Sequence, residues 1–402
     1  MTTTIDNEHK IFNVPNLRFP EFEGEWEEHY LSDYLDFKNG LNPKPERFGK
    51  GIRFISVMDI LNNAVITNDC IRASVDVSEE ELLSFCVENG DILFQRSSET
   101  LEDVGRANVY MDNKPAVFGG FVIRGKKKAE YDPLFFRYLL ASPFARKKII
   151  PMGAGAQHFN IGQEGLNKVK LHFALLDEQK KIARLLSLLD ERIAIQNKII
   201  EDLKKLKSAI IEIEYSPKTK TSSHIGDFIV QTSKRNKDNA IQTILSISNR
   251  QGFIQQSEQF ENRSVASDDT SNYKIVERNS FAFNPARINV GSIARLATFD
   301  RGIVSPMYIC FRTKDNLFPE YLDYYFESKQ FFTEIQKRLE GSVRQCLSFE
   351  GLCNIPLSIP TIEVQQKTGK RLSTLAQGIK LEIDFLELLQ KQKKFLLHQM
   401  FI

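Results

Sequence analysis

The sequence has few of the features that mark a membrane, secreted or metal-binding protein. No stretch of the 402 residues approaches the about 18 consecutive apolar residues of a membrane-spanning helix, so no membrane association is expected. The N-terminus lacks the basic-then-apolar pattern of a secretory signal, which leaves the cytoplasm as the expected location. The five cysteines are odd in number and no two have CxxC spacing, so neither a disulfide framework nor a zinc site is expected.

The motifs of common enzyme sites are also missing from the sequence. There is no GxxxxGKS/T loop for a nucleotide, no GxSxG turn for a serine nucleophile, no HExxH helix and no cluster of Cys and His. Tetrapeptides beginning at Asp132 and Asn284 partly resemble the Asn/Asp-Pro-Pro-aromatic motif of amino-methyltransferases, but both lack the second proline. We therefore expect that this chain has no catalytic residue and binds neither a metal ion nor a cofactor of its own.

Charge of one sign is not in excess either. The 54 Lys and Arg residues against 52 Asp and Glu residues leave a net charge of +2, which does not indicate a general binder of polyanions. The distribution is uneven, with an acidic block between Glu21 and Glu28 and basic clusters at residues 126–128 and 146–148. DNA binding stays possible, because the positions of the charges matter more than their sum.

The most informative feature that is present is an internal duplication. The tripeptide Glu-Gly-Leu occurs at residues 164–166 and again at residues 350–352, which is an offset of 186. Pro133 and Pro319 have the same offset, and each begins a predicted helix rich in Phe, Tyr and Leu. Several matches in the same order indicate two copies of one structural unit.

Each copy contains a globular region that mixes short apolar runs with turn signals, the pattern of a strand-rich α+β fold. Corresponding runs at residues 91–94 and 280–283 are offset by 189. The other runs lie at residues 52–58, 116–123 and 169–174 in the first copy and at residues 243–247, 303–311 and 355–360 in the second. The predicted domains are a globular domain at residues 1–175, a long helix at 176–215, a second globular domain at 216–360 and a second long helix at 361–402.

The two long helices are predicted from heptad spacing, in which apolar residues recur at alternating steps of four and three. At 1.5 Å per residue, helices of about 40 residues are roughly 60 Å long, which exceeds the length of ordinary globular helices. The predicted seam consists of Ile182, Leu186, Leu189, Ile193, Gln196, Ile200 and Leu203 in the first helix and of Leu372, Ile379, Leu386 and Lys393 in the second.

The similar lengths of the helices and the twofold repeat favour pairing of the two helices in an antiparallel coiled coil. This arrangement would place one globular domain at each end and relate the two domains by pseudo-twofold symmetry. The polar seam residues Gln196 and Lys393 would set the register at some cost in stability. The alternative is that both helices are core helices of a compact domain, which their densely charged outer faces disfavour.

Polar and basic residues occur at matching places in the loops of both copies. One set follows the runs at 91–94 and 280–283, and the other precedes the Glu-Gly-Leu segment of each copy. Gln side chains suit adenine and Arg side chains suit guanine in DNA. The predicted DNA-binding residues are Gln95, Arg96, Ser97, Ser98, Arg106, Gln157 and His158 in the first copy and Asn284, Arg287, Asn289, Arg295, Ser342, Arg344 and Gln345 in the second. For each residue alone, an ordinary solvated loop is the alternative.

The whole organisation resembles the specificity subunit of type I restriction-modification systems. In that family a small-residue loop, a Leu-rich turn and an apolar strand with prolines follow each variable globular domain, and Glu-Gln then begins a long helix. The first copy has Glu-Gln at residues 178–179 but Leu175 where a proline is common. The second copy keeps Pro356 and Pro360 but has Val-Gln at residues 364–365.

The resemblance implies that each globular domain is a target recognition domain that reads one half of a bipartite site in double-stranded DNA. The helices would act as a spacer and dock two methyltransferase (modification) subunits, and through them the restriction and translocase subunits. Those partners would bind S-adenosylmethionine, ATP and Mg and carry out the chemistry. Two other functions stay open: a solitary DNA methyltransferase or nuclease, and a coiled-coil scaffold with two protein-binding heads.

Overall fold

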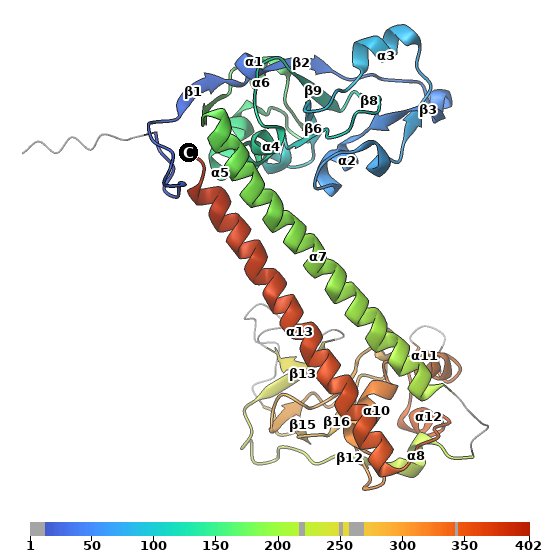
Figure 1. The fold of residues 1–402 in the computed structure, drawn as a ribbon. Coiled ribbons are helices and arrows are strands. Elements are labelled where there is room, and N and C mark those ends of the chain that lie inside the picture. Colours follow the sequence, from blue (N-terminus) through green and yellow to red (C-terminus); the bar gives the residue numbers. More distant parts are fainter. Residues whose placement is uncertain (1–12, 217–221, 249–251, 257–268, 342–344) are drawn as a thin grey trace, which may run out of the picture. The chain divides into compact units, whose positions relative to one another are not determined.

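The computed structural model describes residues 13–216, 222–248, 252–256, 269–341 and 345–402. The chain forms two compact units (Figure 1). Unit 1 comprises Met1–Asn197 and Phe385–Ile402, and unit 2 comprises Lys198–Asp384. Each unit contains one globular part and one end of each long helix, whereas the four domains predicted from the sequence separate the helices from the globular parts.

Two sheets form most of the strand structure of unit 1. The larger sheet is antiparallel, in the order β2 (Leu35–Asn39), β9 (Val122–Lys127), β5 (Ile92–Gln95) and β7 (Ala107–Val109). The smaller sheet has the order β4 (Ser74–Val75), β3 (Phe48–Ile55) and β8 (Ala116–Phe118), with β3 and β8 parallel. Two short antiparallel pairs complete the unit: β1 (Glu27–Tyr30) with β11 (Lys170–Phe173), and β6 (Ser97–Ser98) with β10 (Phe159–Asn160).

Unit 2 repeats this sheet arrangement. Its antiparallel sheet has the order β12 (Ile229–Thr232), β19 (Ile309–Thr313), β16 (Phe281–Phe283) and β17 (Ile293–Arg295). The second sheet has the order β14 (Gly252–Gln255), β13 (Ile244–Ser248), β18 (Arg301–Val304) and β15 (Lys274–Glu277). The pair β13 and β18 is parallel, as β3 and β8 are in unit 1. The repeat that the sequence predicts is therefore also a repeat of topology.

Helices flank the sheets in both units. Those of unit 1 are α1 (Leu31–Tyr34), α2 (Val57–Asn62), α3 (Glu79–Phe85), α4 (Pro133–Ala141), α5 (Pro143–Ile149) and α6 (Gln163–Asn167). Those of unit 2 are α8 (Ile225–Phe228), α10 (Pro319–Tyr325), α11 (Lys329–Gln336) and α12 (Phe349–Cys353). Five of them, α3, α4, α5, α11 and α12, begin with a side-chain cap. Asp132, for example, accepts a hydrogen bond from the Phe135 N–H and precedes Pro133 at the first position of α4. The partial match of this tetrapeptide to a methyltransferase motif is thus part of a helix cap.

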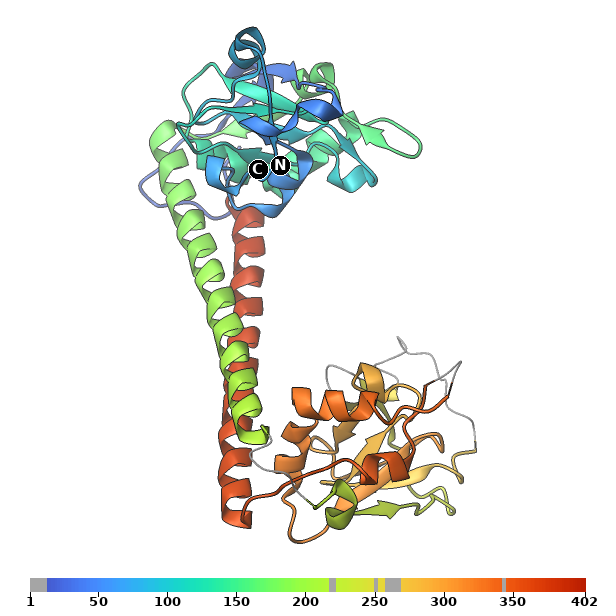
Figure 2. The ribbon, with the colours of Figure 1, turned by 90° about the vertical axis from the view of Figure 1, so that its right-hand side faces the viewer.

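The long helices are α7 (Leu176–Tyr215) and α13 (Ile362–Gln399), within three residues of the predicted bounds. In unit 1 the first half of α7 lies beside the last part of α13, and the Arg192 guanidinium lies 5.6 Å from the centre of the Phe385 ring. In unit 2 the end of α7 lies beside the start of α13, where the Arg371 guanidinium is 3.4 Å from the Glu214 carboxylate. The two helices therefore run antiparallel, as predicted (Figure 2).

The predicted seam lies inside this pair of helices. Ile182, Leu186, Gln196, Ile200, Leu372 and Ile379 are buried, and Leu189, Ile193, Leu203, Leu386 and Lys393 are partly buried. The helix ends also enter the globular cores. Leu186, Leu396 and Phe401 pack with the Phe-rich α4 in unit 1, and Ile211, Tyr215 and Leu372 pack with α10 in unit 2. Each helix pair is therefore continuous with a globular core.

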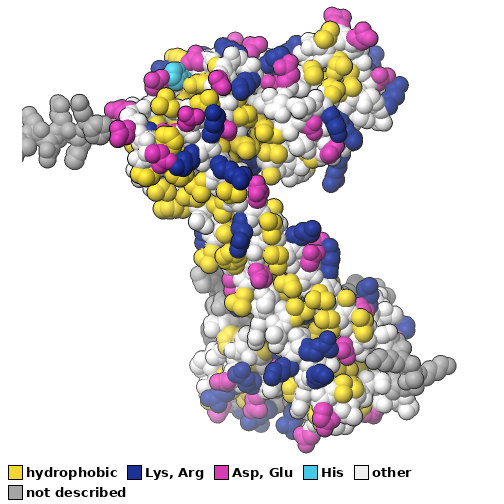
Figure 3. Space-filling view, in the orientation of Figure 1, with side chains coloured by type: hydrophobic (Ala, Val, Ile, Leu, Met, Phe, Trp, Pro, Cys, Tyr) yellow, Lys and Arg dark blue, Asp and Glu magenta, His cyan; other side chains and the backbone are white. Residues whose placement is uncertain are grey.

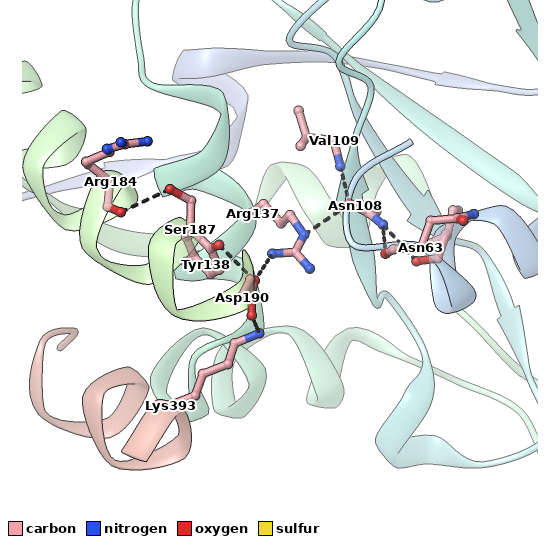
Figure 4. Close-up of polar contacts among 10 residues, drawn as sticks. Asn63, Asn108, Val109, Arg137, Tyr138, Arg184, Ser187, Asp190 and Lys393 are labelled. Carbon is pink, nitrogen blue, oxygen red and sulfur yellow. Dashed lines mark hydrogen bonds and ion pairs between the residues drawn. The ribbon is translucent and has the colours of Figure 1, made fainter. Parts of the chain in front are cut away.

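The charged seam residue Lys393 is paired. Its ammonium lies 2.5 Å from the Asp190 carboxylate and 5.7 Å from the centre of the Tyr138 ring (Figure 4). The same carboxylate accepts a hydrogen bond of 2.8 Å from the Tyr138 hydroxyl and lies 3.4 Å from Arg137. The ion pair offsets the cost that a lysine in a seam would otherwise carry. In unit 2, Lys207 takes the equivalent place over Tyr324, since both residues are offset by 186 from Lys393 and Tyr138.

Three predicted apolar runs differ from what the structure shows. The run at 52–58 ends as a strand at Ile55 and enters α2, and the runs at 116–123 and 303–311 are each divided by a turn between two strands. A fourth difference is in the second copy, where residues 355–360 make one bridge between Pro356 and His224 where the first copy has the strand β11. The prolines at 356 and 360 have no N–H to donate to a ladder, which explains the difference.

A buried glutamine joins each long helix to its globular part. In unit 1 the Gln179 side chain accepts a hydrogen bond of 3.0 Å from the Asp132 N–H and donates one of 2.8 Å to the Ala174 carbonyl. Asp132 begins α4, and Ala174 precedes α7. The amide thus satisfies backbone groups of two segments that would otherwise be buried without partners.

Gln365 makes the same contacts in unit 2. It accepts a hydrogen bond of 2.8 Å from the Phe318 N–H and donates one of 2.9 Å to the Pro360 carbonyl. All of these residues are offset by 186 from their counterparts in unit 1. The residue before the glutamine differs for a local reason. Glu178 binds Arg18 through both oxygens at 2.8 and 2.7 Å, whereas Val364 is exposed.

We predict that Gln179→Ala lowers the free energy of unfolding of unit 1 by about 1–3 kcal/mol, because it leaves buried backbone groups unpaired. Trp26, the single tryptophan of the chain, lies in the core of unit 1, so its fluorescence in a urea titration reports on that unit. Gln365→Ala should leave the Trp26 transition in place and shift the transition that circular dichroism assigns to unit 2. The exposed neighbour Gln366→Ala is the matched control, and an equal loss in that variant would contradict the prediction.

Candidate nucleic-acid interface

The structure brings the two predicted loop sets of unit 1 together. Strand β6, in the loop after β5, pairs with β10, which follows the small-residue loop. The Ile161 N–H donates a hydrogen bond of 2.9 Å to the Arg96 carbonyl, and the Ser97 hydroxyl bonds the Asn160 side chain. A backbone bridge between Ala154 and Asn160 closes the second loop. Residues that are about 60 positions apart in the sequence therefore form one surface.

Unit 2 joins its loops by equivalent bonds. The Leu347 N–H donates a hydrogen bond of 3.0 Å to the Pro285 carbonyl, and a bridge between Glu340 and Cys346 closes the second loop. Leu347, Glu340 and Cys346 are offset by 186 from Ile161, Ala154 and Asn160. Both units thus hold their two loops in the same backbone frame.

The predicted residues of unit 1 differ in how accessible they are. Gln157, His158 and Arg106 are exposed, and Arg96 and Ser97 are partly buried. Gln95 and Ser98 are 5% and 9% exposed. The Gln95 amide donates a hydrogen bond of 2.9 Å to the Ser97 carbonyl, so Gln95 supports the first loop from inside. Gln157 and His158 form the accessible tip of the second loop.

Arg96 and Arg106 are held by neighbouring groups. The Arg96 guanidinium donates a hydrogen bond of 3.3 Å to the Gly120 carbonyl, in the turn between β8 and β9. Arg106 forms an ion pair of 2.6 Å with Asp103, and both side chains are substantially exposed. An exposed pair of this kind is weak, so Arg106 can exchange the carboxylate for a phosphate at little cost.

In unit 2, the predicted residues Asn284, Arg287 and Asn289 follow β16. The Asn284 side chain accepts a hydrogen bond of 3.1 Å from the Ala286 N–H, which fixes the turn. Arg287 is exposed, and Asn289 is partly buried in the short helix η5 (Ile288–Val290). Of the second loop, Gln345 is exposed, and Ser342 and Arg344 lie outside the described residues.

Arg295 points into the protein. Its side chain is 10% exposed and lies 3.1 Å from Asp323 and 3.5 Å from Glu320, both on α10, and it also donates to Asn279 at 2.7 Å. Burial raises the pKa of Asp323 to about 6, against the opposing effect of the Arg295 guanidinium. These contacts connect β17 to α10, so the direct role of Arg295 visible in the structure is to hold the sheet against the helix.

Two exposed apolar residues beside these loops were missed by the sequence analysis. Phe121 is 69% exposed and Met307 is 60% exposed, and they occupy the turns after β8 and β18. Both lie inside single predicted apolar runs, at residues 116–123 and 303–311. The turn signals Gly119-Gly120 and Ser305-Pro306 were the available evidence that these runs are interrupted.

Each unit also exposes apolar side chains along its helix ends, beside the seam, and Figure 3 shows hydrophobic side chains on this part of the surface. The apolar strip of unit 1 consists of Leu188 and Ile195 on α7 and Phe385, Leu388 and Phe395 on α13. The apolar strip of unit 2 consists of Ile199, Leu206 and Ile213 on α7 and Val364 and Leu381 on α13. Rows of this kind on a coiled coil are typical of surfaces that bind another protein.

The described residues include no group of three or more His, Cys, Asp and Glu side chains placed to hold a metal ion. Within the same part of the chain, no helix has both the length and the hydropathy that crossing a bilayer requires.

Two copies of one α+β unit that present different polar loops on the same backbone frame define a duplicated recognition protein. Residues 23–205 and 266–391, most of the chain, match the family described as Type I restriction modification DNA specificity domain. The chain belongs to this family, as the sequence resemblance predicted. The family is one of DNA specificity, which agrees with the expectation of a non-catalytic subunit.

Individual relatives agree with this assignment. The chain is 27% identical over 209 residues to a putative type I restriction enzyme MjaX specificity subunit of Methanocaldococcus jannaschii, covering 51% of this chain and 48% of that protein. It is 25% identical over 174 residues to the type I restriction enzyme EcoKI specificity subunit of Escherichia coli K12, covering 42% and 36%. The matches thus span about half or less of these curated relatives.

A solved structure has the same fold. The crystal structure of a type I restriction-modification system S subunit from M. genitalium matches with a TM-score of 0.60 and 16% sequence identity, over 97% of this chain and 99% of that chain.

We predict that Arg295→Ala lowers the free energy of unfolding by about 2 kcal/mol at pH 8, because it leaves the Asp323 carboxylate without its cation. The loss should fall below about 1 kcal/mol at pH 5. The pKa of Asp323 is raised in the folded state to about 6, so the carboxyl group is mostly protonated and uncharged at that pH. Urea denaturation at both pH values checks this.

The exposed Arg287→Ala is the control for that experiment and should change stability by less than about 0.5 kcal/mol at either pH. A loss for Arg295→Ala that is equal at pH 5 and pH 8 would show that the ion pair with Asp323 does not carry the effect.

Proposed function

We propose that this chain is the DNA-recognition subunit of a type I restriction-modification complex, and that each unit reads one half of a bipartite site in double-stranded DNA. The observation that carries the proposal is that each unit joins its two loops by equivalent backbone bonds. Equivalent backbone bonds hold the loops in both units, while the exposed side chains differ, with Gln157 and His158 in unit 1 and Arg287 and Gln345 in unit 2. Two readers with one frame and different side chains suit a site with two different halves.

The near-neutral net charge of +2 supports a division of labour with partner subunits. Phosphate contacts position a protein on DNA and base contacts give specificity. This chain would supply the base contacts, and the partners would supply much of the phosphate grip.

The long helices would serve as a spacer between the two readers. Helix α7 has 40 residues, so it is about 60 Å long. At 3.4 Å per base pair this length corresponds to about 18 base pairs, the scale of a bipartite site with an unspecified centre.

The two apolar strips would bind two methyltransferase subunits, one at each unit. The restriction and translocase subunits would join through them, and the partners would supply S-adenosylmethionine, ATP and Mg to the reaction. This chain would bind none of these cofactors, and the complex would act in the cytoplasm.

Mapping of methylated adenines in cells with and without this chain tests the proposal. The expected result is a bipartite motif that depends on the chain. No change in methylation would contradict the proposed function.

The spacer predicts a change in the gap of that motif. Duplication of residues 193–199 in α7 together with residues 384–390 in α13 adds one heptad to each helix, preserves the seam pattern and removes no residue of the apolar strips. The gap should lengthen by about 3 base pairs, because seven residues correspond to about 10 Å of helix. Duplication is used because the corresponding deletion would remove Ile195, Ile199, Phe385 and Leu388 from the strips. An unchanged gap in the lengthened variant would contradict a spacer role.

The strips predict a change in stoichiometry. Leu388→Glu with Phe395→Glu places two charges in the apolar strip of unit 1, where they would have to be buried on binding. Native mass spectrometry should then detect complexes with one methyltransferase subunit, whereas the wild-type chain binds two. Lys391→Glu, on an exposed position of α13 outside the strip, should still bind two. Full binding by the double variant would place the docking surface elsewhere.

A further inference from the structure

Phe121 and Met307 occupy equivalent positions in the two units. They are offset by 186, like the framework residues, and both lie in the turn that joins the parallel-paired strand to the central antiparallel sheet. Exposure of 69% and 60% is costly for large apolar side chains, because each leaves apolar surface in water. The same exposed apolar feature in two copies calls for a common role.

Two backbone hydrogen bonds hold the turn of Phe121 beside the reading loop. The Arg96 N–H donates a hydrogen bond of 2.9 Å to the Phe121 carbonyl, and the Val122 N–H donates one of 2.8 Å to the Gly119 carbonyl. A Cβ atom on Gly120 would lie 2.0 Å from the Asn42 side chain, so a larger residue there would require that side chain to move. The exposed Phe121 ring therefore stands on a hydrogen-bonded turn next to Arg96.

Met307 lies in a turn closed by the equivalent bond, which the Tyr308 N–H donates to the Ser305 carbonyl at 3.1 Å. Its sulfur lies 3.7 Å from the Asn284 amide nitrogen, in the loop that corresponds to that of Arg96. The next residue, Tyr308, is buried, and its carbonyl accepts a hydrogen bond of 2.6 Å from the Lys274 ammonium. In both units an apolar side chain thus stands directly beside a polar residue of the predicted DNA-reading loop.

We infer that Phe121 and Met307 are apolar wedges, each of which inserts between adjacent base pairs of the half-site that its own unit reads. Phe and Met are both among the side chains that unstack a base step in this manner. A hydrogen-bonded turn suits the role, because the inserted side chain must keep its position while two bases lose their stacking contact. The neighbouring Arg96 or Asn284 would then contact the edges or phosphates of the opened step. This inference rests on the proposed function.

The test uses the assembled complex of this chain with its methyltransferase subunits, on duplexes carrying the bipartite motif found by methylation mapping. Adenines other than the methylated ones are replaced singly by 2-aminopurine, whose fluorescence rises when stacking is lost. The wild-type complex should raise the fluorescence at one step in each half-site. Phe121→Ala should abolish the rise in one half-site and Met307→Ala in the other. Each should weaken binding about tenfold.

Phe121→Leu keeps an apolar wedge and should retain most of the signal and affinity. Leu83→Ala is the matched control, since Leu83 is 85% exposed on α3 of the same unit and should have no effect. Wild-type fluorescence that stays unchanged on binding would overturn the wedge. If replacement of a thymine by uracil weakens binding as much as Phe121→Ala does, without unstacking, the contact is with a thymine methyl group and the inference is wrong. A complex that binds no motif at all contradicts the proposed function itself.

Discussion

The junction between each long helix and its globular part is the constraint on which both units depend. A globular sheet, a loop and a helix meet there, and their backbone groups are shielded from water. Gln179 and Gln365 satisfy those groups with one side chain each, using both ends of the amide. Because the amide joins the start of α4 or α10 to the start of the long helix, it couples the direction of the helix to the position of the sheet.

The sheets and the bonds between the loops position the candidate DNA-reading loops. Strands β5 and β16 lie at the centre of their sheets, and the loops that follow them are tied to the second loops by the bonds from Ile161 and Leu347. Side chains at the loop tips take no part in these bonds. They can therefore change without loss of the frame, which is how one scaffold can acquire different DNA specificities.

Particular residues show where sequence patterns succeed. The heptad spacing of α7 and α13 identifies the buried seam. Apolar residues at every third or fourth position lie on one face of a helix, and that face packs against the partner helix. Patterns say less about polar side chains. Arg295 and Arg287 are equivalent choices for DNA contact by residue type, yet Arg295 is largely covered and paired with Asp323, whereas Arg287 is exposed. Apolar runs also say little about exposure. Phe121 and Met307 lie inside such runs, and the run does not show which of its residues faces outward at a turn.

The sequence by itself therefore determined the duplication, the two α+β units and the antiparallel long helices, because these depend on periodicity and on repeated segments. It also identified the loops that are candidates for DNA contact. Only the tertiary structure decided which of those loop residues are accessible and how Lys393 is accommodated. The same holds for the apolar side chains that stand beside the reading loops. The physical reason is that accessibility and ion pairing depend on partners distant in the chain, such as Asp190 for Lys393 and α10 for Arg295, and no local pattern specifies which distant residue will be the neighbour.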